Sequence, residues 1–292
     1  KNFKYLNLDI RNLNGLEKIF QEYKKKINLI IHCAAQPSHD YGTKYPFLDF
    51  SINATGTLNL LELTKKHSPD SVFIFMSTNK VYGDNPNKLK LIEKQSRWEL
   101  KKNDNFYNGI KEQFPLDDCI HSFFGVSKTY ADLIVQEYGK NVGLKTVCFR
   151  GGCITGPNHS GASLHGFLSF LVRSSLEKRQ YNLIGYKGKQ VRDNLHSNDL
   201  VNCFWQFYKK PTYGEIYNIG GGRFSNCSII EALNYVEDFT KIKIKRKIFK
   251  NSRVGDHIWY ISDISKFKKH YPKWKQKYNT KKIIEELIEY QK

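Results

Sequence analysis

A phenylalanine and a lysine four residues apart occupy the positions of a proton-transfer pair. The stretch HSFFGVSK covers residues 121–128 and continues with a helical pattern. Phe124 and Lys128 would share one helix face, because residues four apart are neighbours on a helix. A Tyr at position 124 would bond a substrate hydroxyl, and the lysine charge would lower its pKa. Phe cannot donate or accept a proton, so this pair lacks its hydroxyl.

Small and polar residues end several predicted strands of the chain. Asp9 follows one such strand, where an acid can bond adenine or ribose or simply cap a turn. Ala34 and Ala35 end another and would let a flat ligand approach the backbone. Ser77 and Thr78 place hydroxyls at a third end, where the helix carrying the lysine could face them. Ligands bind at the carboxyl ends of parallel strands, so these positions are the candidate site.

The elements that would position these residues alternate between strand and helix. Apolar runs predict strands at 3–10, 27–35, 71–83 and 145–157, and helical patterns cover 13–26, 47–67 and 121–143. This alternation predicts an α/β fold with a doubly wound parallel (Rossmann) sheet. The pattern changes after Pro157. We therefore predict a sheet domain over 1–157 and a smaller interleaved substrate domain over 158–292, with about 194–222 returning to the sheet.

Composition narrows the class of protein. The 292 residues are 40% hydrophobic and carry a net charge of +19, mostly from scattered Lys. Nucleic-acid readers favour Arg at base edges, so a solvated Lys-rich surface is the preferred interpretation and no nucleic-acid partner is predicted. The six cysteines form no C-x-x-C pair. With no disulfide framework, metal motif, signal peptide or membrane-length span, a cytoplasmic protein without a membrane partner is expected.

The motifs together resemble the extended short-chain dehydrogenase/reductase family, which contains the sugar-nucleotide epimerases and dehydratases. The matching pieces are LDIRN, IIHCAAQPS, NATGTLNLLE, MSTNKVYGD, FGVSK, RGGCITGP, KQVRDNLHSNDL, YNIGGG and RVGD. The resemblance implies an NAD-dependent epimerase that oxidises a sugar carbon and returns the hydride to the other face. It also implies a CDP-linked deoxyhexose as substrate, and a homodimer that pairs through helices at 49–67 and 122–139.

The resemblance also implies a role for individual residues. Asp9 and Ile10 would contact adenine, and Ala34, Ala35 and Gln36 would line the cofactor. Lys128 would hold the nicotinamide ribose, while Ser77 and Thr78 would bond the reacting hydroxyl. Cys153, Arg192 and Arg253 would contact the substrate, with the two arginines on its diphosphate.

Three departures from the family pattern qualify these roles. The G-x-x-G-x-x-G loop is absent and the single methionine is Met76, so the first strand–helix–strand unit is expected to be missing from this chain. Phe124 replaces the catalytic Tyr. Tyr82 is a better candidate than His121 to carry the proton in its place, because His121 is more simply explained as a helix cap or a surface histidine. Cys153 stands where many relatives carry a polar residue that touches substrate. It would be either a weak hydrogen-bond donor or a packing residue, and packing is the preferred interpretation.

Two further hypotheses compete with the epimerase. One is a catalytically silent nucleotide-sugar-binding relative, left by loss of the Tyr. The other is a nucleic-acid binder, which retention of the clamp arginines argues against. Dehydration is not expected, because the pair after the hydroxyl strand end is Asn79-Lys80 and not the acidic pair that elimination needs.

Overall fold

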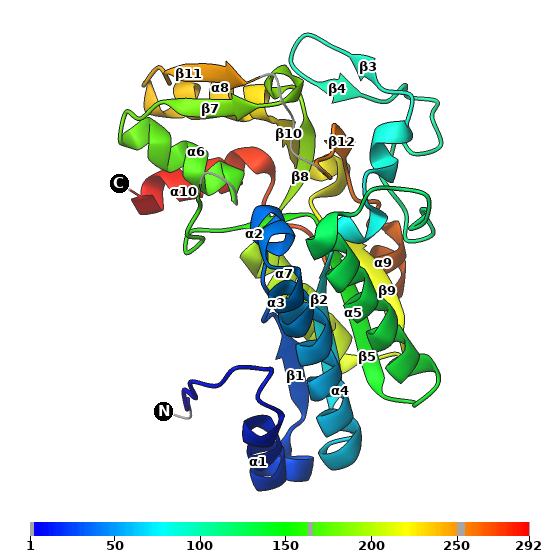
Figure 1. Ribbon diagram of the computed structural model, residues 1–292. Coiled ribbons are helices and arrows are strands. Elements are labelled where there is room, and N and C mark those ends of the chain that lie inside the picture. The colour runs from blue at the N-terminus through cyan, green and yellow to red at the C-terminus, as the bar shows by residue number, and fades with distance from the viewer. Residues whose placement is uncertain (1–2, 163–165, 250–254, 292) are drawn as a thin grey trace. The chain divides into compact units, whose positions relative to one another are not determined.

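The computed structural model describes residues 3–162, 166–249 and 255–291, and the chain divides into two compact units (Figure 1). The first unit contains residues 1–77, 122–149 and 208–216, and the second contains 78–121, 150–207 and 217–292. Each unit is described by itself. The domain boundaries predicted from the sequence stay a prediction.

A sheet has the strand order β1-β2-β5-β9, and the first unit contains all of β1 and most of β2 and β5. The strands of this sheet are β1 (Leu29–His32), β2 (Val72–Thr78), β5 (Lys145–Gly151) and β9 (Glu215–Ile219). β1 and β2 run parallel, with Leu29 opposite Val72 and His32 opposite Phe75. Strands of a parallel sheet are covered on their faces and read as continuous apolar runs. The predicted α/β class with a parallel Rossmann sheet is confirmed.

Three helices cover this sheet in the first unit: α1 (Leu13–Tyr23), α4 (Gly56–His67) and α5 (Ser122–Lys140). Their apolar faces share one core with β2 and β5, which includes Leu16, Leu61, Phe73, Val135 and Cys148. The helix predicted at 47–67 is interrupted. It forms α3 (Pro46–Phe50), a π-helical turn (Ser51–Thr55) and then α4, while the short α2 (His39–Lys44) follows β1.

The strand predicted at 3–10 is wrong. Residues 3–8 form neither helix nor strand, and Phe3 and Tyr5 are 86% and 76% exposed. A strand needs a neighbour to satisfy its backbone groups, and this segment pairs with no strand among the described residues. The apolar residues of this segment were therefore not enough to form a strand without a neighbouring strand.

The second unit is built from shorter elements around its own cores. Strands β10 (Asn226–Ser228), β8 (Val191–His196) and β12 (Trp259–Tyr260) form a sheet in that order, with β6 (Cys153–Thr155) also parallel to β8. Strands β7 (Tyr181–Ile184) and β11 (Arg246–Phe249) pair in parallel, and β3 (Ile92–Glu93) pairs antiparallel with β4 (Trp98–Glu99). The helices are α6 (Phe167–Leu176), α7 (Ser197–Lys209), α8 (Ile229–Thr240), α9 (Ser265–His270) and α10 (Thr280–Gln291).

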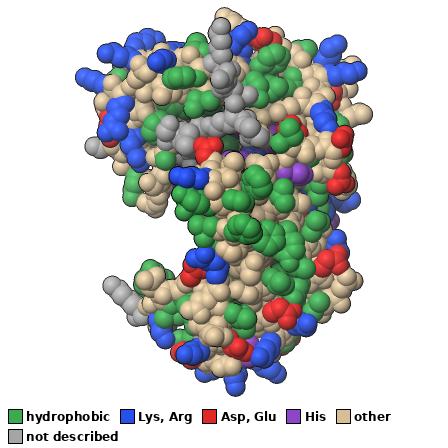
Figure 2. All heavy atoms as spheres, in the orientation of Figure 1, with side chains coloured by type: hydrophobic (Ala, Val, Ile, Leu, Met, Phe, Trp, Pro, Cys, Tyr) green, Lys and Arg blue, Asp and Glu red, His purple; other side chains and the backbone are tan. Residues whose placement is uncertain are grey.

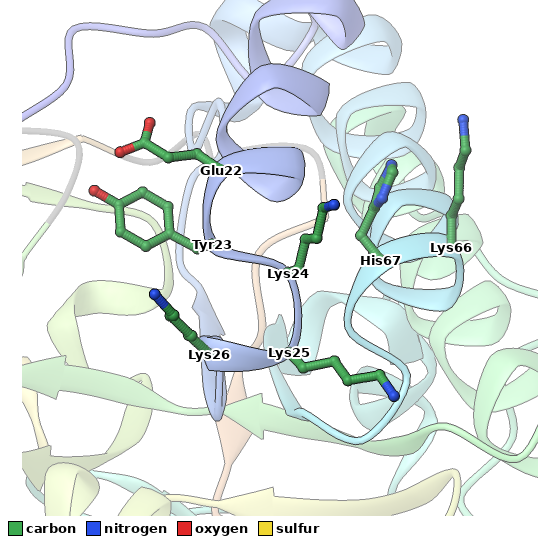
Figure 3. A pocket seen from close by; sticks show the side chains of 7 residues that line it. All are labelled: Glu22, Tyr23, Lys24, Lys25, Lys26, Lys66 and His67. Carbon is green, nitrogen blue, oxygen red and sulfur yellow. The ribbon is translucent and has the colours of Figure 1, made fainter.

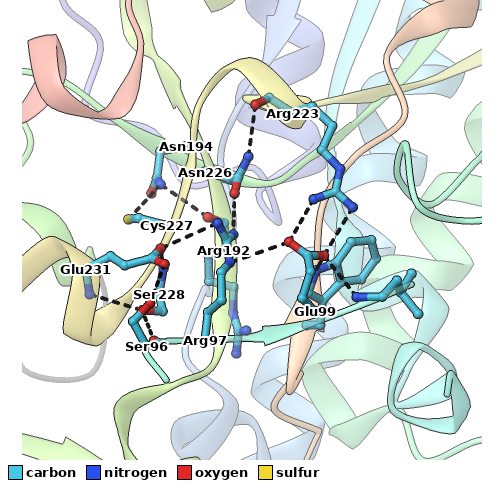
Figure 4. A network of polar contacts seen from close by, with 12 residues as sticks. Ser96, Arg97, Glu99, Arg192, Asn194, Arg223, Asn226, Cys227, Ser228 and Glu231 are labelled. Atoms are coloured by element: carbon cyan, nitrogen blue, oxygen red, sulfur yellow. Dashed lines mark hydrogen bonds and ion pairs between the residues drawn. The ribbon is translucent and has the colours of Figure 1, made fainter. Parts of the chain in front are cut away.

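A buried polar network ties the β3–β4 hairpin to this unit (Figure 4). Glu99 accepts two bonds from the Arg223 guanidinium, at 2.9 and 3.1 Å, and a third from the Trp259 indole at 3.0 Å. Ser228 caps α8 in a capping box with Glu231, and its hydroxyl donates to the Ser96 carbonyl at 2.6 Å. Because every charge in the network has a partner, we assign it to holding the hairpin.

Among the residues described, none of the helices is both long and apolar enough to span a membrane.

Candidate active site

Lys128 lies on α5 with its ammonium group buried at the ends of β1 and β2. Its Nζ donates to the Met76 carbonyl at 2.8 Å and lies 4.0 Å from the centre of the Phe75 ring. Burial lowers the pKa of Lys128 to about 8, although Asp132 and other anionic partners oppose the shift. A buried ammonium with a depressed pKa and a carbonyl as its hydrogen-bond partner is poised to exchange partners with a ligand hydroxyl.

Ser77 is held by a carboxylate that the sequence did not reveal. Its hydroxyl donates to Asp132 Oδ2 at 2.5 Å, and the other oxygen of Asp132 accepts from Gln136 at 2.8 Å. Asp132 is fully buried on α5. Because the Ser77 hydroxyl donates its single hydrogen to Asp132, it can only accept a hydrogen bond from a ligand hydroxyl. Thr78, the next residue, accepts a bond from the Lys80 amide at 3.2 Å.

The loop after β1 presents small side chains beside this lysine. Cys33, Ala34 and Ala35 are exposed, and the Cys33 thiol lies close enough to Lys128 to interact electrostatically. Gln36 is buried, and its side chain donates to Asp49 at 2.5 Å. Ala34 and Ala35 are thus small and exposed, and their predicted role in lining a flat ligand stays a prediction.

A buried polar network fixes the other side of that loop. The backbone N–H of Gln36 donates to Asn53 Oδ1 at 2.9 Å, and the Asn53 side chain donates to the Ser127 hydroxyl at 3.0 Å. Ser127 in turn donates to Asp49 Oδ2 at 2.5 Å. Sequence reasoning missed this network. The four-residue spacing of Asp49 and Asn53, which puts them on one face of a helical segment, was a signal for it.

Asp9 and Ile10 precede α1 at the surface of the first unit. Asp9 is exposed and bonded by the Arg11 guanidinium, which holds the pKa of Asp9 at about 2. Ile10 packs at Gly56, where an added Cβ would lie 2.5 Å from Ile10 Cδ1. The backbone at Ile10 is therefore fixed against α4, with its carbonyl bonded by Asn59 at 3.1 Å.

Phe124 and Tyr82 are both buried. Phe124 is 7% exposed in the first unit. Tyr82, in the second unit, has no exposed surface, donates to Asn218 at 2.8 Å and accepts from Arg150 at 3.0 Å. Burial raises the pKa of Tyr82 to about 12, although Arg150 opposes the shift. A buried hydroxyl with a raised pKa and two hydrogen-bond partners is poorly suited to carry a proton. The role predicted for Tyr82 stays a prediction. His121, the alternative, lies 2.7 Å from the Leu116 carbonyl.

A cationic cluster surrounds Cys153 in the second unit. Arg192 Nη2 contacts Asp256 Oδ1 at 2.5 Å, and Lys80 Nζ lies 3.9 Å from the same oxygen. Desolvation raises the pKa of the Cys153 thiol to about 11, and the thiol interacts electrostatically with Arg192, Asp193, Lys80 and Asp256. The structure thus brings Cys153 and Arg192 together, and adds Lys80 and Asp256. Arg253 lies outside the described residues.

A separate hollow on the first unit is lined by Lys24, Lys25, Lys26 and Lys66 together with Glu22, Tyr23 and His67 (Figure 3). The three consecutive lysines are exposed. Lys66 is paired with Glu17 at 2.6 Å. The hollow holds none of the predicted site residues, and its lysines contribute to the solvated basic surface expected from composition.

The parallel sheet defines a Rossmann-type α/β protein, and the buried Lys128 lies at the ends of its strands. The chain belongs to the NAD dependent epimerase/dehydratase family, whose model matches residues 1–220. The family resemblance is thereby confirmed, and the protein is an NAD-dependent enzyme of this family.

Individual relatives agree with this assignment. The chain is 29% identical to the CDP-paratose 2-epimerase of Salmonella typhi, covering 99% of this chain and 84% of that protein. It is 28% identical to the UDP-glucuronate 4-epimerase of Thermodesulfobacterium geofontis, covering 92% of this chain and 73% of that protein. The fold is similar to that of Thermus thermophilus UDP-glucose 4-epimerase complexed with NAD, at a TM-score of 0.81 and 22% identity over 100% of this chain and 85% of that one.

Proposed function

We propose that this protein epimerises a CDP-linked deoxyhexose through a transient keto sugar. The observation that carries the proposal is the likeness to a CDP-paratose 2-epimerase over 99% of this chain, combined with the buried Lys128 at the strand ends. The pair Asn79-Lys80 supports epimerisation over dehydration, because elimination needs an acid–base pair there. Lys80 instead donates to the Gly255 carbonyl at 2.8 Å.

NAD, when bound, accepts a hydride from a sugar carbon and later returns it. In this proposal Lys128 exchanges the Met76 carbonyl for the hydroxyls of the nicotinamide ribose. Ala34, Ala35 and Gln36 line the cofactor, and Asp9 and Ile10 meet its adenine. The exposed small residues next to the lysine support this fit.

The second unit would hold the nucleotide diphosphate of the substrate. Arg192 and Lys80 offer two charged donors beside Asp256, and charged donors of this kind suit an anion. Cys153 would contact the sugar nucleotide from the same cluster, and Arg253 would add a further donor. Ser77 and Thr78 would bond the reacting sugar hydroxyl.

A homodimer is part of the proposal. Apolar side chains are exposed on α3 and α5, which pack beside each other in the first unit. They include Phe47 at 92%, Phe123 at 53% and Val126 at 54% exposed. Figure 2 shows hydrophobic side chains gathered in the middle of the face that it draws. Exposed apolar patches of this kind mark interaction sites. Light scattering should give twice the chain mass, and Phe47→Glu combined with Phe123→Glu should give a monomer.

A reducing, cytoplasmic location completes the proposal. Each of the six cysteines carries a free thiol in the described structure, three of them buried. Free thiols persist in reducing compartments. A redox-sensitive fluorescent fusion in the native host would test the location.

A substrate panel tests the activity. The full-length protein with NAD is incubated with CDP-, UDP-, GDP- and dTDP-sugars in deuterated water, and products are identified by NMR. We expect an epimer only from a CDP-sugar, without deuterium at the inverted carbon, since the hydride returns internally. Conversion of a UDP-sugar alone would contradict the CDP assignment. Tight binding of a nucleotide sugar without any conversion would favour the catalytically silent hypothesis.

A further inference from the structure

An imidazole lies beside Phe124, the residue at the position of the missing hydroxyl. His39 begins α2, and its ring centre lies 5.0 Å from that of Phe124, at an angle of 60° between the planes. Both residues belong to the first unit. His39 is half-buried, whereas Phe124 is 7% exposed. A titratable side chain therefore lies beside the position at which the sequence pattern lacks a hydroxyl.

A serine from the start of α5 holds one nitrogen of this ring. Ser122 Oγ lies 2.8 Å from His39 Nδ1 and also accepts a bond from the Gly125 amide at 3.3 Å. A hydroxyl can donate to a bare Nδ1 or accept from a protonated one. When Nδ1 donates to the serine, Nε2 has a lone pair in the neutral ring and a hydrogen in the imidazolium. The serine thus supports the ring as either acid or base.

We propose that His39 carries the proton of the epimerisation in place of the family tyrosine. The inference rests on the proposed function. In the forward half, the sugar C–H bond breaks and its hydride passes to NAD, while the hydroxyl proton passes to His39 Nε2 and a C=O bond forms. In the return half, the hydride comes back to the other face of the keto sugar, and the imidazolium returns its proton to the oxygen.

Other candidates in the first unit fit this role less well. Burial lowers the pKa of His32 to about 3, and its Nε2 lies 2.9 Å from Thr57, so it stays neutral. Tyr130 lies on α5 two residues beyond Lys128 and packs against Phe50, with ring centres 5.7 Å apart. Neither contacts Phe124 in the described structure, whereas His39 does.

Four variants of the full-length protein test the proposal: His39→Gln, Phe124→Tyr, the double variant, and His67→Gln as a control histidine of the same unit. We expect His39→Gln to lower kcat roughly 10²- to 10⁴-fold, the range of general acid–base catalysis. The kcat of the double variant should be at least about tenfold higher than that of His39→Gln, because the tyrosine hydroxyl replaces the imidazole at the adjacent position. His67→Gln should match wild type.

Binding measurements separate catalysis from folding. NAD affinity and the melting temperature of His39→Gln should equal those of wild type. The histidine NMR signal missing in His39→Gln should shift in wild type when the nucleotide sugar is added. Wild-type kcat in His39→Gln, or an equal loss in the double variant, would overturn the proposal while leaving the epimerase intact. Wild-type protein without conversion of any nucleotide sugar would instead overturn the proposed function, and the role of His39 with it.

Discussion

Lys128 of the first unit and Arg192 of the second are both buried cations, but they differ in whether a negative charge lies in contact with them. Lys128 bonds a carbonyl, and burial lowers its pKa to about 8. Arg192 contacts a carboxylate, Asp256, at 2.5 Å. Although burial raises the pKa of Asp256, Arg192 and Lys80 hold it below its ordinary value. The lysine is a cation whose charge is costly, whereas the arginine belongs to a compensated pair.

This difference suggests a division of roles. A lysine with a depressed pKa readily exchanges one neutral oxygen partner for another, which suits the hydroxyls of a ribose. Arginine stays charged at every relevant pH and offers a forked donor, which suits a diphosphate. The predictions below separate these roles.

The largest effect is expected at Lys128. Lys128→Ala should abolish conversion of the nucleotide sugar, because Lys80, the lysine that follows β2, bonds the Gly255 carbonyl instead. Product formation over long incubations is the measurement. Lys66→Ala, which removes an exposed lysine paired with Glu17, is the control and should retain wild-type activity. A Lys128→Ala protein with normal turnover would remove the lysine from the site.

Substrate binding should depend on Arg192. Arg192→Ala should weaken nucleotide-sugar binding by about 1.5–3 kcal/mol, the range for hydrogen bonds to charged groups. NAD affinity should hardly change, since Arg192 belongs to the substrate cluster. Calorimetric titration measures both. Arg179→Ala, at an exposed pair with Glu177, is the matched control. Equal losses for NAD and the nucleotide sugar would argue against separate roles.

The pH dependence of stability should report the cost of the lysine charge. The folded state releases the Lys128 proton near pH 8, whereas the unfolded chain keeps it until about pH 10.5. Between these values the unfolded state binds more protons, so the fold gains stability as pH rises. Relative to Lys128→Met, wild type should gain at most about 1.4 kcal/mol per pH unit in this window.

Urea unfolding at pH 7, 8, 9 and 10 gives this difference directly, because subtraction cancels the titration of other groups. At pH 7 Lys128→Met should be at least as stable as wild type, since a buried charge is replaced by an apolar chain of similar size. Parallel curves for the two proteins would mean that Lys128 keeps an ordinary pKa.

The smallest effect is expected at Tyr82. Tyr82→Phe should cost about 1–3 kcal/mol of stability, because Arg150 and Asn218 lose a buried partner, and kcat should change little. Thermal unfolding and turnover, measured on the same samples, check both. A loss of kcat without a loss of stability would restore Tyr82 as the proton carrier predicted from the sequence.

Local patterns in the sequence accounted for much of the fold and for part of the site. Apolar periodicity predicted the strands at β1, β2 and β5 and the helices α1 and α5. Phe124 and Lys128 were predicted on one helix, because a four-residue spacing determines the helix face without any knowledge of the rest of the chain. The family was likewise readable from the motifs, which the match over residues 1–220 confirms.

Tertiary structure decided which polar groups meet. No spacing predicts that Ser77 donates to Asp132, or that His39 lies against Phe124, because these partners are 55 and 85 residues apart in the chain. The strand predicted at 3–10 failed for the same reason, since a strand depends on a neighbour that local sequence does not specify. Periodicity reports which face of an element is apolar, whereas hydrogen-bond partners and pKa shifts arise only when packing removes water and brings distant groups together.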